Sequence, residues 1–147
     1  MMKGLGEVPN MIDGLEYDAK IVNDWYVEMA KDVLKEKTRI GGTWVVAQAA
    51  PKRAMRDSIR KILGDQVIFV LLNLSEETNI KRIEKRHGGS DMDPQMKEMI
   101  LGMLNKMLAA YEPAQADEKN AFNIGIEHHM SKYDVAEEIL SKVSKVL

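Results

Sequence analysis

The spacing of apolar and polar residues divides this chain into alternating helices and strands. Residues 16–37 and 52–63 carry apolar side chains at helical spacing, so each range predicts a helix. The run at 67–74 is apolar throughout, as expected for a parallel strand that is covered on both faces. Shorter apolar runs at 43–47 and 122–126 predict two further strands, of which 43–47 is expected to be buried.

Helix-start signals support the boundaries of the later elements. Ser75 stands where an N-cap residue is expected after the strand at 67–74. Asp93 and Pro94 pair an N-cap with proline at the first helical position, and Ser131 with Asp134 resembles a capping box. The predicted order is helix, strand, helix, strand, two helices, strand and helix. This alternation predicts an α/β fold with a parallel sheet.

Composition limits the functions that such a fold could serve. The 147 residues are enough for a single domain with a hydrophobic core, and we expect residues 1–147 to form one domain. A net charge of −2 gives no electrostatic reason to bind nucleic acid, so any attraction for anions must be local. The chain has no cysteine, no apolar run near the roughly 20 residues of a membrane span, and no signal-peptide core at its start. We therefore expect a cytoplasmic protein without nucleic-acid or membrane partners.

A basic segment follows the predicted strand at 43–47. Lys52, Arg53 and Arg56 lie where a turn enters a helix, at the end of a strand at which α/β sheets bind ligands. Guanidinium groups and a helix N-terminus both favour phosphate or carboxylate, so these three residues are candidate binding residues for an anionic small molecule. The alternative is a solvated basic face on which Asp57 pairs with a neighbour.

A second pair of cations ends the helix after Ser75. Arg82 and Arg86 are four residues apart and share a helix face just before the glycines at 88–89. A cationic helix end beside a flexible segment would suit a lid that clamps a phosphate. The alternative is that these cations only complement the dipole at the helix C-terminus.

Methionines recur at helical spacing between residues 92 and 107. The stripe consists of Met92, Met96, Met99, Met103 and Met107. Methionine makes adaptable binding surfaces, but a stripe of this period is more typical of a core or a subunit interface. The sequence therefore leaves core packing and association with a partner open.

Other kinds of chemistry have weak support in the sequence. His128 and His129 are adjacent but lack a third ligand at a recognised spacing, so we expect no metal site. The chain contains no G-x-S-x-G elbow, no cysteine nucleophile and no phosphate loop of the form G-x-x-x-x-G-K-[ST]. The catalytic residues therefore remain unassigned.

Three segments together resemble the later two-thirds of a P-loop small-molecule kinase, of the gluconokinase and shikimate kinase group. The first resembles the family's Lys-x-x-x-Arg-Asp-x-x-Arg segment, with Lys52 and Arg56 at its first two cations. The second resembles the Arg-x-x-x-Arg lid, with Arg82 and Arg86. The third, from Tyr111-Glu112-Pro113 to the strand at 122–126, resembles the family's entry to its last strand.

This resemblance implies an incomplete version of the family's three-layer α/β fold. The first strand and its phosphate loop precede these segments in the family, and we expect both to be missing from this chain. The missing strand would lie between the strands at 43–47 and 67–74, which leaves two apolar edges without a partner. Such edges recruit another strand. The two strands could close up, a second copy could pair or swap elements, or a separate chain could supply the missing part.

The resemblance also implies a function. ATP and Mg²⁺ would bind to the loop that this chain lacks, and the acceptor would be a sugar acid or a similar anion. Lys52, Arg53 and Arg56 would hold the acceptor, while Arg82 and Arg86 would clamp the transferred phosphate. The chain alone is expected to be inactive as a kinase. One alternative is a non-catalytic interaction or dimerisation module derived from such a kinase, and another is a protein that binds an anionic metabolite without chemistry.

Overall fold

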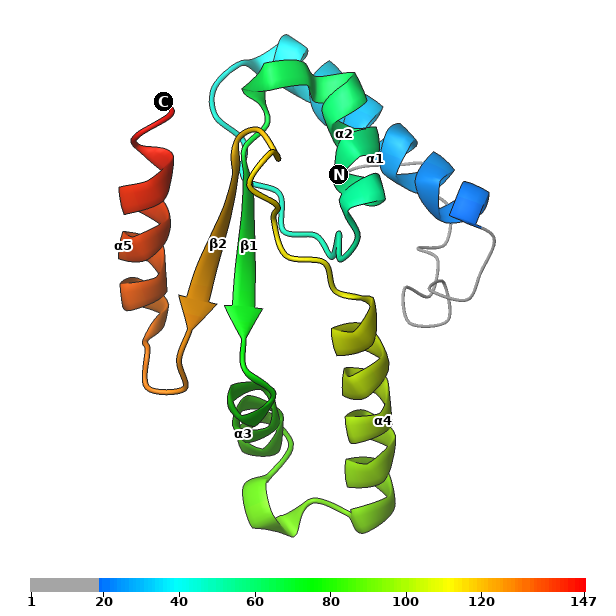
Figure 1. Cartoon of the computed structure of the whole chain (residues 1–147), viewed down its shortest axis with the longest axis vertical. Coiled ribbons are helices and arrows are strands. Elements are labelled where there is room, and N and C mark those ends of the chain that lie inside the picture. The colour runs from blue at the N-terminus through cyan, green and yellow to red at the C-terminus, as the bar shows by residue number, and fades with distance from the viewer. Residues whose placement is uncertain (1–18) are drawn as a thin grey trace. The chain divides into compact units, whose positions relative to one another are not determined.

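Helices α1 (Ala19–Ile40) and α2 (Arg53–Leu63) pack together in the first of two compact units. The computed structural model describes residues 19–147, apart from the side chains of residues 19, 21 and 90 (Figure 1). Residues 16–18, where the first predicted helix begins, lie outside the described residues. The first unit comprises described residues 19–67 and 110–112, and the second comprises 68–109 and 113–147.

One face of α1 and one face of α2 form the core of the first unit. Its buried apolar side chains are Val22, Tyr26, Met29, Ala30 and Val33 of α1, with Met55 and Ile59 of α2. Their helical spacing confirms the predicted helices. Two hydrogen bonds also connect α1 to later parts of this unit. The Tyr26 hydroxyl donates to the Ala49 carbonyl, and the Ser58 hydroxyl of α2 donates to Asn23.

The segment at 43–47 is not a strand, and this prediction is wrong. Residues 43–49 are exposed and without regular secondary structure, and Val45 is 94% exposed. A β-strand is stable only when its backbone pairs with a neighbour, and this segment pairs with no strand among the described residues. Its apolar composition alone therefore does not produce a strand.

The second unit is built around two parallel strands. Strands β1 (Phe69–Leu74) and β2 (Ala121–Ile126) pair in register from Phe69 with Ala121 to Leu74 with Ile126. Helices α3 (Glu76–Arg86) and α4 (Pro94–Ala110) lie between them in the chain, and α5 (Lys132–Val143) follows β2 and packs against it (Figure 1). A short 3-10 turn occurs at Gly89–Asp91 in this unit, and another at Gly64–Gln66 in the first unit. Both predicted strands of the second unit are confirmed.

Three helix starts are also confirmed. The Ser75 hydroxyl accepts a hydrogen bond from the Thr78 backbone at the start of α3. The Asp93 carboxylate accepts from two backbone N–H groups at the start of α4. Ser131 and Asp134 form a reciprocal capping box at the start of α5, and the hydrogen bond from the Ser131 hydroxyl is the main cause of a lowered pKa at Asp134. These short-range signals can be read from the sequence because their partners are three residues apart or fewer.

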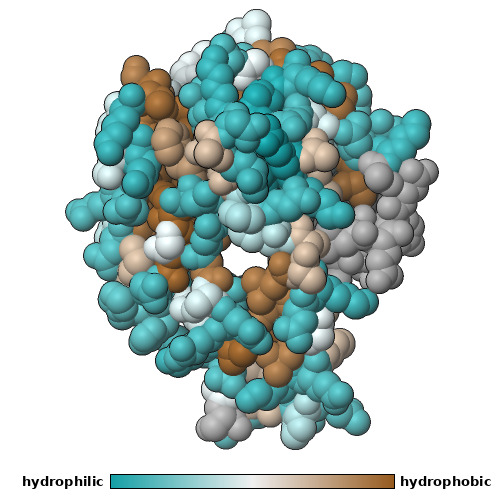
Figure 2. Space-filling view, in the orientation of Figure 1, coloured by the Kyte–Doolittle hydropathy of each residue, from teal (hydrophilic) through white to brown (hydrophobic). Residues whose placement is uncertain are grey.

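The two faces of β1 differ in burial. Leu71 is buried, but Leu72 on the opposite face is 46% exposed, although its registered partner Ile124 on β2 is buried. The prediction that this strand is covered on both faces is therefore wrong. Hydrophobic residues reach the surface around the strands and α5 in Figure 2, which agrees with the exposure of Leu72 and of Leu140 on α5.

The described residues form a mixed α/β structure with a two-stranded parallel sheet and five α-helices. None of the helices described here combines the length and the apolar character needed to cross a membrane.

Candidate functional site

The start of α2 holds an internal carboxylate where an anion was expected. The backbone N–H of Arg53, the first residue of the helix, donates to Glu112 Oε2 at 2.7 Å. The backbone N–H of Glu112 in turn donates to the Pro51 carbonyl at 2.7 Å. Because the N-terminus of a helix is its positive end, Glu112 provides the negative charge that this position favours.

Arg56 is a structural residue of this site. Its side chain is 1% exposed, and Nη1 donates to the carbonyl oxygens of Ala50 and Pro51 at 3.1 and 3.4 Å. A guanidinium removed from water needs internal acceptors, and these carbonyls supply them. Arg56 therefore fixes the turn that carries Lys52 into α2.

Asp57 pairs with two arginines of the same helix. Its carboxylate lies 2.6 Å from Arg60 Nη1 and 3.6 Å from Arg53 Nε. These are the i+3 and i−4 neighbours expected of a solvated charged helix face. The Arg53 side chain is about one-third exposed, so a ligand anion would have to compete with Asp57 for it.

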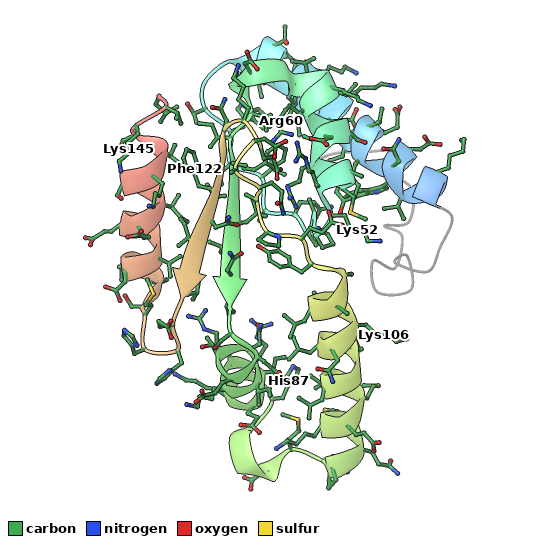
Figure 3. The ribbon with its side chains drawn as sticks, viewed as in Figure 1. Lys52, Arg60, His87, Lys106, Phe122 and Lys145 are labelled. Atoms are coloured by element: carbon green, nitrogen blue, oxygen red, sulfur yellow. The ribbon has the colours of Figure 1, made fainter. Side chains whose placement is uncertain are left out.

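Lys52 is the cation of this cluster without an internal partner. It is half-buried at the N-cap position of α2, and its ammonium group forms no hydrogen bond or ion pair with any residue that the structure describes. Figure 3 labels Lys52 at the point where the chain enters α2. An ammonium group without an internal partner can exchange bound water for a ligand carboxylate or phosphate.

The second group of cations lies at the carboxyl end of the parallel strands. Arg82 Nη2 donates to the Glu127 carbonyl at 3.4 Å and to the Met130 carbonyl at 3.5 Å, both in the loop after β2. α3 itself follows the carboxyl end of β1. Arg82 therefore lies at the edge of the sheet where α/β proteins bind their ligands.

Arg86 lies one helical turn beyond Arg82. Its side chain is exposed and has no hydrogen bond or ion pair with the described residues. His87, labelled in Figure 3, ends the helix and is also exposed. The hydrogen bonds of Arg82 are long and go to neutral acceptors, and those to a phosphate would be shorter and stronger.

Two further features of the second unit give less support for a ligand-binding site than the arginines of α3. Among the described residues, no group of three or more His, Cys, Asp or Glu side chains could hold a metal ion, and the rings of His128 and His129 simply meet edge to face at 5.7 Å. An open depression of about 450 Å³ is lined by Glu84, Gly89, Met92 and Lys97. Two of these residues, Glu84 and Lys97, form an ion pair at 2.7 Å, so the charged groups of the lining cancel and do not favour an anion.

The structure gathers the candidate residues in two groups. Lys52, Arg53 and Arg56 come together at the start of α2 in the first unit, and Arg82 and Arg86 share one face of α3 in the second. Sequence reasoning did not assign a role to Glu112, because its partner Arg53 is 59 positions away and one sequence gives no sign of such a contact.

Comparisons with protein-family models, with curated proteins and with solved structures found no match for this chain.

Proposed function

We propose that this chain is the acceptor-binding and lid portion of an ATP-dependent small-molecule kinase of the sugar-acid type, and that it transfers no phosphoryl group by itself. The observation that carries this proposal is the position of Arg82 and Arg86. Both follow the carboxyl end of β1, and Arg82 donates to the loop after β2, at the ligand-binding end of a parallel sheet.

The acceptor-binding group that we propose in the first unit depends on Lys52. Its ammonium group has no partner among the described residues, so it is the cation of the α2 cluster that we assign to the acceptor carboxylate. Arg53 would contribute through its partly exposed guanidinium. Arg56 would act as a positioning residue, since its buried guanidinium holds the carbonyls of the preceding turn.

The phosphate-binding group that we propose in the second unit depends on the two arginines of α3. Arg86 is exposed without an internal partner, and Arg82 would exchange its two long hydrogen bonds to carbonyls for charge-assisted bonds to phosphate. Two guanidinium groups on one helix face could stabilise the negative charge of a transferred phosphoryl group.

ATP and Mg²⁺ do not fit the residues at hand. The 147 residues contain no phosphate loop of the form G-x-x-x-x-G-K-[ST], and the described ones provide no cluster of metal-binding side chains. We therefore assign no step that involves nucleotide or metal to this chain, and expect a coupled assay with ATP, Mg²⁺ and gluconate to give no turnover. Turnover at ordinary kinase rates would contradict this part of the proposal.

Calorimetric titration tests the binding proposal with two probes, gluconate and 6-phosphogluconate. Lys52→Ala should weaken both ligands by about tenfold, because each carries a carboxylate. Arg86→Ala should weaken 6-phosphogluconate by about tenfold and leave gluconate unchanged. Lys61→Ala on the exposed face of α2 and Lys85→Ala on α3 serve as matched controls. Absence of binding by the unaltered protein, or an equal loss in the control variants, would refute the site.

A non-catalytic interaction module is the second candidate. It is favoured by large apolar side chains that reach solvent, including Trp44, Val45, Leu72 and Met99. Exposed apolar side chains that lie together on one element, as Met99 does with Met96 and Met103 on α4, are typical of a site of association. The same titrations separate the candidates, since binding of 6-phosphogluconate supports the kinase portion, and association in light scattering without binding of either probe supports the module.

A further inference from the structure

Helix α4 has two apolar sides, and the described residues bury only part of this apolar surface. Ile100, Leu101, Leu104 and Leu108 line one side of the helix, and within this group Leu104 is buried and the others are partly exposed. A second side is formed by four methionines that are 38–59% exposed: Met96, Met99, Met103 and Met107. We call these four residues the methionine face. A surface helix needs only one apolar stripe against its core, so this second stripe is free for another contact.

The charged residues of α4 lie away from the methionine face or at its ends. Lys97 pairs with Glu84 of α3 at 2.7 Å, and Glu98 falls on the opposite side of the helix. Lys106 lies beside the C-terminal end of the face, and Asp93 is the N-cap at the other end. Figure 3 labels Lys106 on α4. The centre of the face is therefore uncharged, with one anion and one cation at its two ends.

The order of these residues is symmetric about the middle of the helix. Met96 and Met103 are equally distant from the midpoint between Met99 and Ile100, and so are Asp93 and Lys106. When two copies of a helix pair antiparallel about such a midpoint, equidistant residues come to the same level. Met96 of one copy then lies level with Met103 of the other, and each Asp93 shares an end with a Lys106.

We propose that the methionine face binds the same face of a second copy, with the two α4 helices antiparallel. Burial of eight methionines would supply the attraction, and methionine adapts to a partner surface because it is unbranched. The antiparallel order places opposite charges at the same end, whereas a parallel order would place Lys106 level with Lys106. This inference rests on α4 alone and stands independently of the kinase proposal.

A single helix face is small for a protein interface. We therefore expect a dimer that dissociates on dilution, with a dissociation constant on the order of micromolar. Analytical ultracentrifugation over a hundredfold range of concentration measures it. Replacing Met99 and Met103 together by Glu should weaken association at least tenfold, and both positions are exposed, so α4 should still form. Glu98→Gln, on the opposite side of the helix, is the control and should change nothing.

Disulfide crosslinking tests the antiparallel order, because the chain has no cysteine of its own. Met96→Cys and Met103→Cys, each alone, should give little covalent dimer, whereas an equal mixture of the two should give a mixed dimer under mild oxidation. Efficient crosslinking of each single variant with itself would show a parallel pair and overturn the proposal. A monomer at all concentrations, with no crosslinking in the mixture, would also overturn it and would leave the face to a different protein.

Discussion

The first and second units use their arginines in different ways. In the first, Arg56 is 1% exposed and donates to the carbonyls of Ala50 and Pro51. In the second, Arg86 is exposed and has no hydrogen bond or ion pair with the described residues. A buried guanidinium is committed to its internal acceptors, while an exposed one can exchange water for a ligand anion. Burial and partners, and not position in a cationic motif, therefore separate a structural arginine from one that is available to a ligand.

The largest expected effect is on the stability of Arg56 variants. Arg56→Ala should lower the free energy of unfolding by about 2–4 kcal/mol, because it leaves a buried space and removes a hydrogen-bond donor from the carbonyls of Ala50 and Pro51. Arg86→Ala should change the free energy of unfolding by less than about 0.5 kcal/mol, since its side chain is solvated. Urea denaturation followed by circular dichroism measures both. Equal stability of the two variants would contradict the distinction between the two arginines.

Because of Tyr26, the stability of the first unit should depend on pH in the alkaline range. Burial raises the pKa of Tyr26 from 10.0 to about 12, and its hydroxyl donates to the Ala49 carbonyl. The unfolded chain therefore loses this proton first, and the contribution of Tyr26 to stability is present below pH 10 and is lost as the pH rises towards 12. We expect a loss of roughly 1–2 kcal/mol from this group.

A pair of tyrosine variants isolates this effect. Tyr26→Phe should reduce the loss of stability between pH 10 and 12, whereas Tyr133→Phe should not, because Tyr133 is 70% exposed. Urea denaturation at pH 8, 10 and 11 provides the comparison. The same pH dependence in both variants would show that Tyr26 is not the group responsible.

Replacing Glu112 should lower the free energy of unfolding by less than replacing Arg56. Glu112→Ala removes the acceptor of the Arg53 N–H at the start of α2 and should cost about 0.5–1 kcal/mol, within the range of helix-capping groups. Glu98→Ala on α4 is a suitable control, because its carboxylate is exposed and has no internal partner among the described residues. A loss no larger than that of the control would mean that Glu112 does not stabilise the helix.

A substitution in the segment at 43–47 should have the smallest effect on the free energy of unfolding. Val45 is 94% exposed, so Val45→Thr should change the free energy of unfolding by less than about 0.5 kcal/mol. A buried strand residue would lose more on gaining a hydroxyl. Thermal unfolding distinguishes the two cases, and a large loss would restore the buried strand that the sequence predicts.

Local signals made most of the fold predictable. The N-caps Ser75, Asp93 and Ser131 bond to groups within three residues, so the sequence is enough to locate these helix starts. The segment at 43–47 was mispredicted because strand formation requires a distant partner, which composition does not reveal. The exposure of Leu72 was missed for the same reason, since it depends on what covers the sheet.

The site was predictable in its residue types but not in its contacts. The sequence indicated cations at the start of α2 and the end of α3, and both groups form as expected of their helical spacing. It did not distinguish the buried Arg56 from the partnerless Lys52, because burial is set by tertiary packing. It also did not reveal Glu112 at the N-terminus of α2, because that contact joins residues 59 positions apart.

The most direct test of the account is to map 6-phosphogluconate binding by NMR on the isotopically labelled protein. We predict that titration shifts the amide resonances of Lys52 and Arg53 at the start of α2 and also those of Arg82 and Arg86 on α3. Residues of the exposed segment 43–47 and of α5 should not respond. Unchanged spectra at millimolar ligand, or shifts confined to other parts of the chain, would contradict anion binding by these two groups of cations.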